Sequence, residues 1–108
     1  MEDYEMVEKE ATEILEDMGG NAEDICSGDC TTFAMRLVDN LKNLNIEAVI
    51  VNNLNNEMTD ELNGYKTINA EYENGISHCY VKACGYFFDA FDTDGCEKEQ
   101  ELGYHAIY

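Results

Sequence analysis

Apolar residues recur in the first part of the chain with the spacing of an α-helix. Between residues 3 and 18 they return every three or four positions, and acidic residues occupy the opposite face. Gly19 and Gly20 follow at once and predict the end of this helix. Its apolar positions are Tyr4, Val7, Ala11, Ile14, Leu15 and Met18.

A second helix is predicted over residues 30–44, after a loop over residues 21–28. Asp29 occupies the expected N-cap position, where a carboxylate can accept hydrogen bonds from the N–H groups of the first turn. The apolar stripe of this helix is Phe33, Leu37, Val38, Leu41 and Leu44.

The remainder of the chain has the pattern of β-strands. The strands are predicted at 46–51, 68–73, 76–83, 86–91 and 104–108. Asn74-Gly75 and Cys84-Gly85 predict tight hairpin turns, and residues 92–95 predict a third turn. Residues 52–66 are rich in Asn and predict a loop with at most one short helix near Met58–Leu62.

This order predicts one α+β domain over residues 1–108, with N-terminal helices packed on an antiparallel β-meander. A chain of 108 residues has the length of a single domain and supports one modest core. It contains no proline and no internal repeat.

The net charge of the chain limits the kinds of molecule that it can bind. Twenty-four acidic residues against six basic ones give a formal net charge of −18. A field of that sign repels nucleic acids and anionic membranes, so we expect no direct binding to either. Three interpretations stay open: a strongly solvated surface, attraction to basic substrates or partners, and imitation of DNA phosphates toward a nucleic-acid-binding protein.

The N-terminus and the cysteines suggest a compartment. The first residues are acidic, unlike a secretory signal or a transit peptide, and no apolar run approaches the roughly 20 residues that span a bilayer. We therefore expect a cytoplasmic protein. Five cysteines, an odd number without an export signal, argue against a full disulfide framework.

Cys30 is the candidate nucleophile. It takes the first position of the second predicted helix, where backbone N–H groups and the helix dipole favour a thiolate. The same N–H groups suit an oxyanion formed after attack on a carbonyl. The alternative is that Cys30 is a small buried residue that fills space beneath the helix.

His78 and Asp89 are the candidate base and orienting acid. If Cys84-Gly85 is a two-residue loop, the strand register makes Asp89 the diagonal neighbour of His78, at about 7–8 Å between Cα atoms. A hydrogen bond bridges that distance and would fix the imidazole tautomer. Asp92 is the rival third member, which a bulge at Gly85 would favour.

Three segments carry a resemblance to a known family. They are residues 27–34 (SGDCTTFA), 77–83 (SHCYVKA) and 85–90 (GYFFDA). In this order they resemble the papain-like cysteine protease superfamily, closest to its transglutaminase-like and small bacterial or phage branches. That superfamily has a Cys at a helix start, a His opening a strand as HxxV, and an Asp on the next strand. The resemblance covers about residues 27–92.

The resemblance implies a papain-like fold and a Cys30–His78–Asp89 triad. It implies thiolate attack on a protein or peptide amide, ester or thioester, and an acyl-enzyme that passes to water or to an amine. The backbone N–H of Cys30 is the expected oxyanion donor, with Asn21 as an alternate because a papain-type Gln is missing.

Two metal sites are weighed and not predicted, and no cofactor is expected. Zinc could take Cys26, Cys30 and His78 with Cys79 or Cys84, but CxxC spacing is absent and adjacent strand residues point to opposite faces. The run at residues 92–95 shares features with a calcium loop but lacks its spacing and terminal Glu.

The predicted function is thus a papain-like cysteine hydrolase or acyltransferase acting on a protein or peptide substrate, in which basic residues would favour binding. The alternative is a non-catalytic acidic binding or inhibitor protein, viral and similar to a DNA mimic, that keeps the same frame. Cys79, Cys84 and Cys96 are expected to be packing or turn residues.

Overall fold

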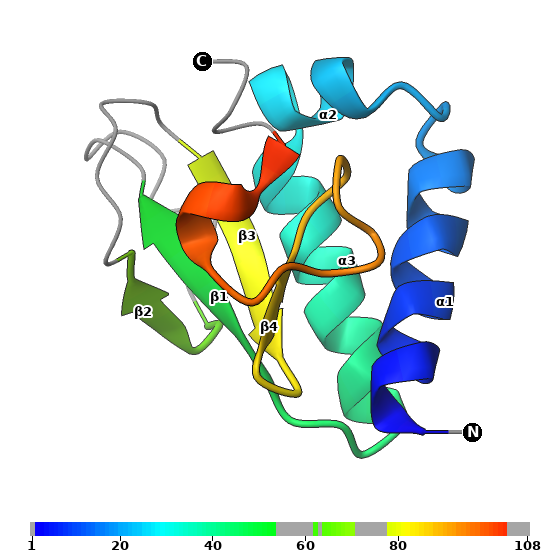
Figure 1. Cartoon of the computed structure of the whole chain (residues 1–108), viewed down its shortest axis with the longest axis vertical. Helices are drawn as coiled ribbons and strands as arrows, with labels where there is room; N and C mark the ends of the chain where they lie inside the picture. The colour runs from blue at the N-terminus through cyan, green and yellow to red at the C-terminus, as the bar shows by residue number, and fades with distance from the viewer. Residues whose placement is uncertain (1, 54–61, 63, 71–77, 104–108) are drawn as a thin grey trace.

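The computed structural model describes residues 2–53, 62, 64–70 and 78–103. Its elements are the helices α1 (Asp3–Asp17), α2 (Ala22–Gly28) and α3 (Cys30–Asn43), the strands β1 (Ala48–Asn53), β2 (Thr67–Asn69), β3 (His78–Ala83) and β4 (Tyr86–Phe88), and the 3₁₀ helix η2 (Glu99–Glu101). Figure 1 shows α1 and α3 side by side, with α2 across the end where α3 begins. The α+β class is as predicted.

The strand order corrects the predicted meander. The sheet runs β2-β1-β3-β4, and β1 pairs parallel to β2 and antiparallel to β3. The predicted hairpin between residues 68–73 and 76–83 is wrong, because β1 lies between their described parts. β1 takes the central place since Ile50 and Val51 are buried on opposite faces of the sheet, whereas every residue of β2 is exposed, as suits an edge strand.

Helices α1 and α3 form the main core with the sheet. The apolar stripe of α1 buries Val7, Ala11 and Ile14, and both helices follow the predicted bounds closely. In α3 the buried members of the predicted stripe are Phe33, Leu37 and Leu41. The prediction that Leu44 belongs to this buried stripe is wrong, because Leu44 lies one residue beyond the end of α3 and is 38% exposed.

Helix α2 replaces the loop predicted over residues 21–28. Asn21 caps it, and its Oδ1 accepts a hydrogen bond from the Asp24 N–H at 3.2 Å. Asp29 is the N-cap residue of α3, but its side chain makes no capping hydrogen bond. The Asp29 N–H closes α2 by donating to the Ile25 carbonyl at 2.7 Å, so its backbone takes a helix-end conformation and not the extended one that capping needs.

The sheet face opposite α3 is covered by the segment around η2. Val51, Tyr80 and Leu102 form a second buried cluster there. The Tyr80 hydroxyl donates to Glu99 Oε1 at 2.6 Å, which ties η2 to the centre of β3. Beside it, the predicted turn at residues 92–95 is present, with the Gly95 N–H donating to the Asp92 carbonyl at 3.0 Å.

Several predictions fall wholly or partly outside the described residues. They include the Asn74-Gly75 turn, most of the loop at 52–66 with its short helix, and the strand at 104–108. The first predicted strand is shifted by two residues, to β1, and β4 is shorter than predicted because the chain leaves the β3 ladder after Phe88.

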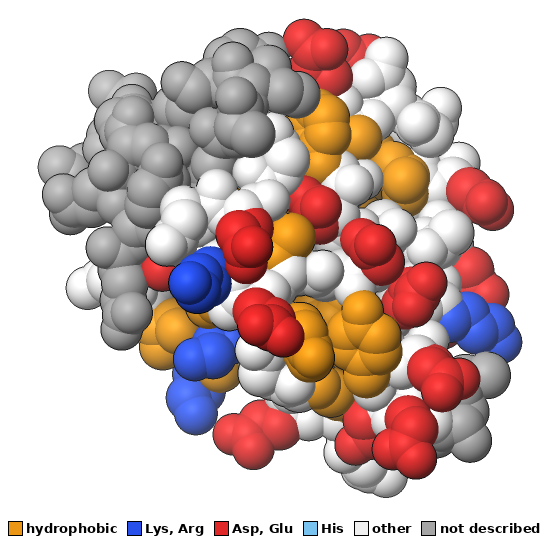
Figure 2. Space-filling model, in the orientation of Figure 1, with side chains coloured by type: hydrophobic (Ala, Val, Ile, Leu, Met, Phe, Trp, Pro, Cys, Tyr) orange, Lys and Arg blue, Asp and Glu red, His pale blue; other side chains and the backbone are white. Residues whose placement is uncertain are grey.

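The excess of acidic residues is visible on the surface of the folded protein. Figure 2 shows Asp and Glu side chains spread over one face, with few Lys or Arg between them. Within the described segments, no helix has the length and apolar character needed to cross a membrane.

Candidate functional site

The turn between β3 and β4 sets the register of the site. Cys84 and Gly85 both have positive φ, 55° and 81°, which matches the two-residue type I′ turn that joins antiparallel strands. Ala83 pairs with Tyr86 and Val81 with Phe88. This is the predicted register.

His78 and Asp89 meet as that register requires. His78 Nε2 lies 2.9 Å from Asp89 Oδ2, and the two residues are 0% and 1% exposed. A carboxylate can only accept, so Nε2 carries the proton in this pair and the lone pair of the neutral ring lies on Nδ1. The other Asp89 oxygen, Oδ1, accepts the Asp92 N–H at 2.8 Å. Both carboxylate oxygens are therefore fixed in direction.

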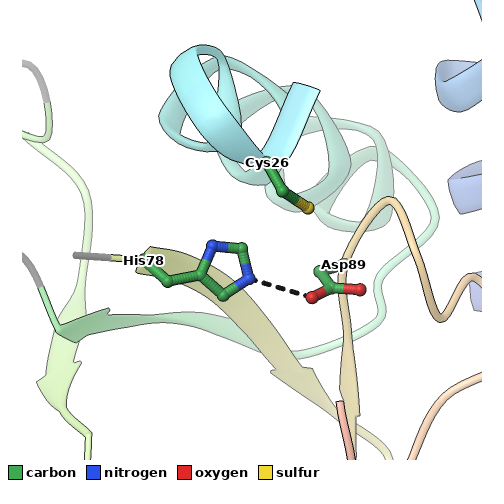
Figure 3. A group of neighbouring side chains, drawn as sticks. All are labelled: Cys26, His78 and Asp89. Carbon is green, nitrogen blue, oxygen red and sulfur yellow. Dashed lines mark hydrogen bonds and ion pairs between the residues drawn. The ribbon is translucent and has the colours of Figure 1, made fainter. Parts of the chain in front are cut away.

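Cys26, which the sequence suggests only as a member of the zinc set that is not predicted, joins His78 and Asp89 in the structure. A sulfur, a ring nitrogen and a carboxylate oxygen from Cys26, His78 and Asp89 all lie within 4.8 Å of one another. Figure 3 shows the thiol pointing from α2 toward the His78–Asp89 pair. The sequence predicts a loop over residues 21–28 and therefore gives no direction for this side chain. Its spacing of four from Cys30 is the only sequence signal that associates the two thiols.

The environment of Cys26 keeps its thiol protonated. Burial, reinforced by the nearby Asp89 carboxylate, raises the pKa of Cys26 well above its ordinary value. Hydrogen bonds from the backbone of Ala90 and Phe91 act in the opposite direction but do not reverse the shift. Cys26 is 2% exposed, so it is neither acidic nor accessible.

Cys30 opens α3, as predicted, and is 8% exposed. It does not belong to the tight group of Cys26, His78 and Asp89. Its thiol is close enough to Cys26 to contribute to the raised pKa of that residue. Cys30 thus lies near Cys26 and is the more exposed residue of the two.

Asp92 and Asn21, the alternate candidates for the site, make hydrogen bonds that stabilise the local fold. Asp92 Oδ2 accepts the Gly103 N–H at 2.5 Å, while its own N–H donates to Asp89. Burial raises the pKa of Asp92 above its ordinary value. Asp92 thereby fastens the segment after η2 to the site and holds Asp89. Asn21 uses its side-chain oxygen to cap α2.

The remaining cysteines behave as packing or turn residues. Cys79 faces the α1–α3 core, on the opposite side of β3 from Tyr80. Cys84 is exposed in the β3–β4 turn, and Cys96 Sγ donates to the Glu101 carbonyl at 3.6 Å. All five cysteines lie in the described residues, and no disulfide joins any two of them. Cys79 points to the other face of β3 from its neighbour His78, and Cys84 follows the opposite end of the strand, so neither is well placed to share a zinc ion with His78.

Comparison of the chain with protein-family models, curated proteins and solved structures gives no match.

Proposed function

We propose that this protein is a papain-like cysteine hydrolase or acyltransferase that uses Cys30, His78 and Asp89. The observation that carries the proposal is the buried His78–Asp89 hydrogen bond of 2.9 Å beside the helix that Cys30 opens. Such a pair holds an imidazole in one tautomer, which a base next to a thiol needs. The resemblance of residues 27–34, 77–83 and 85–90 to the papain-like superfamily supports the same class.

Each side chain has a defined role in this proposal. His78 accepts the Cys30 thiol proton at Nδ1, because Nε2 is occupied by Asp89. Asp89 orients the ring and stabilises the imidazolium that forms. The N–H groups in the first turn of α3 favour the thiolate and then the oxyanion of the tetrahedral intermediate.

Cys30 is a better nucleophile than Cys26 on physical grounds. A thiol reacts as its thiolate, and the pKa of Cys26 is raised by burial and by the Asp89 carboxylate. Cys30 lies at the positive end of a 14-residue helix and retains more exposed surface. Cys26 packs on the pair that activates Cys30.

The proposed reaction is acyl transfer. The Cys30 thiolate attacks the carbonyl carbon of an amide, and the C–N bond breaks as His78 protonates the leaving amine. The thioester then passes its acyl group to water or to a second amine, whose proton returns to His78. A net charge of −18 supports a protein or peptide substrate with basic residues.

Alkylation by iodoacetamide at neutral pH tests the proposal without a known substrate. The reduced protein is labelled in a chelating buffer, and peptide mass mapping gives the rate at each cysteine. We expect Cys30 to react faster than the exposed Cys84, and the His78→Ala variant to lose that advantage. Cys84 is a control within the same molecule because it lies in an exposed turn at the opposite end of β3 from His78.

The opposite result separates the alternatives. If Cys30 reacts no faster than Cys84 in protein that is folded by circular dichroism, the hydrolase proposal fails. The acidic binding or inhibitor protein then becomes the better interpretation, since the charge pattern does not depend on an active thiol. Fast labelling at Cys26 in place of Cys30 would overturn the choice of nucleophile.

A further inference from the structure

Cys26, His78 and Asp89 also form a donor set for a metal ion. Thiolate sulfur, imidazole nitrogen and carboxylate oxygen are the three ligand types that Zn²⁺ takes in proteins. One ligand atom from each residue lies within 4.8 Å of the other two. We propose that these side chains bind Zn²⁺, or Co²⁺ as its spectroscopic substitute, and that the bound ion replaces the His78–Asp89 hydrogen bond.

The geometry needs only small adjustments. Zinc bonds of about 2.0–2.3 Å place tetrahedral ligand atoms about 3.3–3.7 Å apart. The three donors lie no more than 4.8 Å apart, so the most distant pair must approach by only about 1 Å to reach the ligand spacing. The 2.9 Å between Nε2 and Oδ2 is shorter than a ligand–ligand distance, so binding through those atoms must end that hydrogen bond. Water supplies the fourth ligand, as in sites with three protein ligands.

Charge balance favours a divalent ion here. A Cys26 thiolate and an Asp89 carboxylate together neutralise two positive charges, and the imidazole stays neutral. A buried group without net charge avoids most of the desolvation penalty of isolated ions. All three residues are almost fully buried, with exposed fractions between 0% and 2%.

Groups around the donors already hold them in place. The Asp92 N–H donates to Asp89 Oδ1 at 2.8 Å, which directs Oδ2 toward His78. Such outer hydrogen bonds orient metal-binding carboxylates. Backbone hydrogen bonds from Ala90 and Phe91 to the Cys26 sulfur favour its thiolate form, and a bound cation would offset the burial and the Asp89 charge that otherwise keep the thiol protonated. The metal site does not require the proposed hydrolase activity.

Metal binding must release one proton. The Cys26 S–H bond breaks, the sulfur–metal bond forms, and the thiol proton leaves to solvent. If the ion binds Nε2, the ring proton moves to Nδ1, and if it binds Nδ1, the ring proton stays on Nε2, so the ring releases none. Apparent affinity should therefore rise by about tenfold per pH unit over the range in which the Cys26 thiol is protonated before binding.

A Co²⁺ titration of the reduced, metal-free chain of 108 residues tests the site. Excess Mg²⁺ occupies the exposed carboxylates, and the readout is the thiolate-to-Co²⁺ charge-transfer absorption. We expect saturation at one ion per chain, with one proton released, in the wild type and in the matched control Cys84→Ser. Cys26→Ser should lose the absorption. Asp89→Asn should keep it with an affinity reduced by at least about tenfold, since it loses a charged ligand.

Two results would overturn the metal site. One is a wild-type protein without charge-transfer absorption at one equivalent, and the other is an unchanged absorption in Cys26→Ser. If Cys26→Ser does not fold, as judged by circular dichroism, an unchanged Co²⁺ affinity in Asp89→Asn overturns the site instead. Cys30 alkylation is measured in chelator, so failure of the hydrolase proposal and failure of the metal site are distinguishable.

Discussion

His78 Nε2 and Asp89 Oδ2 lie 2.9 Å apart across 11 residues of sequence. The two-residue turn at Cys84-Gly85 folds β4 back on β3 so that these positions become diagonal neighbours. Both groups are buried, so each depends on the other for the hydrogen bonding that water would otherwise supply. The pair therefore contributes to the stability of the fold, independently of the chemistry proposed for it.

Asp89→Ala should destabilise the protein by about 2–4 kcal/mol, because a buried donor at His78 and a partly buried one at Asp92 lose their common acceptor. Urea denaturation at neutral pH measures this loss. The control is Asp94→Ala, whose exposed side chain should change the free energy of unfolding by no more than about 0.5 kcal/mol. Equal effects of the two substitutions would contradict a structural role for the buried pair.

Gly95→Ala should be much more harmful than Gly20→Ala. Both glycines have positive φ, 83° and 77°, so both substitutions carry the same backbone strain. A Cβ at Gly95 would come within 2.8 Å of the Phe88 ring, whereas a Cβ at Gly20 meets nothing within 4 Å. Overpacking should add about 1–3 kcal/mol to the destabilisation by Gly95→Ala. Thermal unfolding followed by circular dichroism compares the two variants directly.

Cys84→Asn should stabilise the protein by a few tenths of a kcal/mol, up to about 1 kcal/mol. Cys84 has φ of 55°, a conformation that Asn adopts more readily than Cys, and Asn-Gly is the preferred sequence for a type I′ turn. The side chain is exposed, so no packing is lost. A lower urea midpoint than the wild type would contradict the turn assignment.

Alkaline pH should weaken the fold through Cys26. Burial and Asp89 raise the folded-state pKa of Cys26 above its ordinary value of 9.0, so the folded protein holds this proton more tightly than the unfolded chain. The contribution is complete below pH 9.0 and is lost as the pH rises further, since the unfolded thiol ionises first. Denaturation at pH 8 and pH 10 should show a smaller decline for Cys26→Ala than for wild type. Cys84→Ala, at an exposed thiol, should change the decline less.

Local patterns were sufficient for the parts of the site that lie close in sequence. Helical spacing placed Cys30 at the start of α3, and the Cys84-Gly85 turn placed His78 against Asp89. Both inferences use short-range rules, since a helix repeats over a few residues and a tight turn fixes which strand residues pair. The roles of these residues in catalysis are proposals that alkylation will test.

Strand order and the third side chain of the buried group depended on the tertiary structure. The pattern favours a hairpin between neighbouring strands. However, β1 has apolar residues on both faces, and a central position in the sheet buries both of those faces. The sequence predicts a loop around Cys26 because α2 has only seven residues. Such a segment is too short to show helical spacing of apolar residues or to be stable as an isolated helix. Packing against α3 and β3 supplies that stability, and it turns the Cys26 thiol toward His78 and Asp89. The sequence alone determined how β3 pairs with β4 and which side chains are candidates for chemistry, whereas burial between distant segments decided which of these side chains meet.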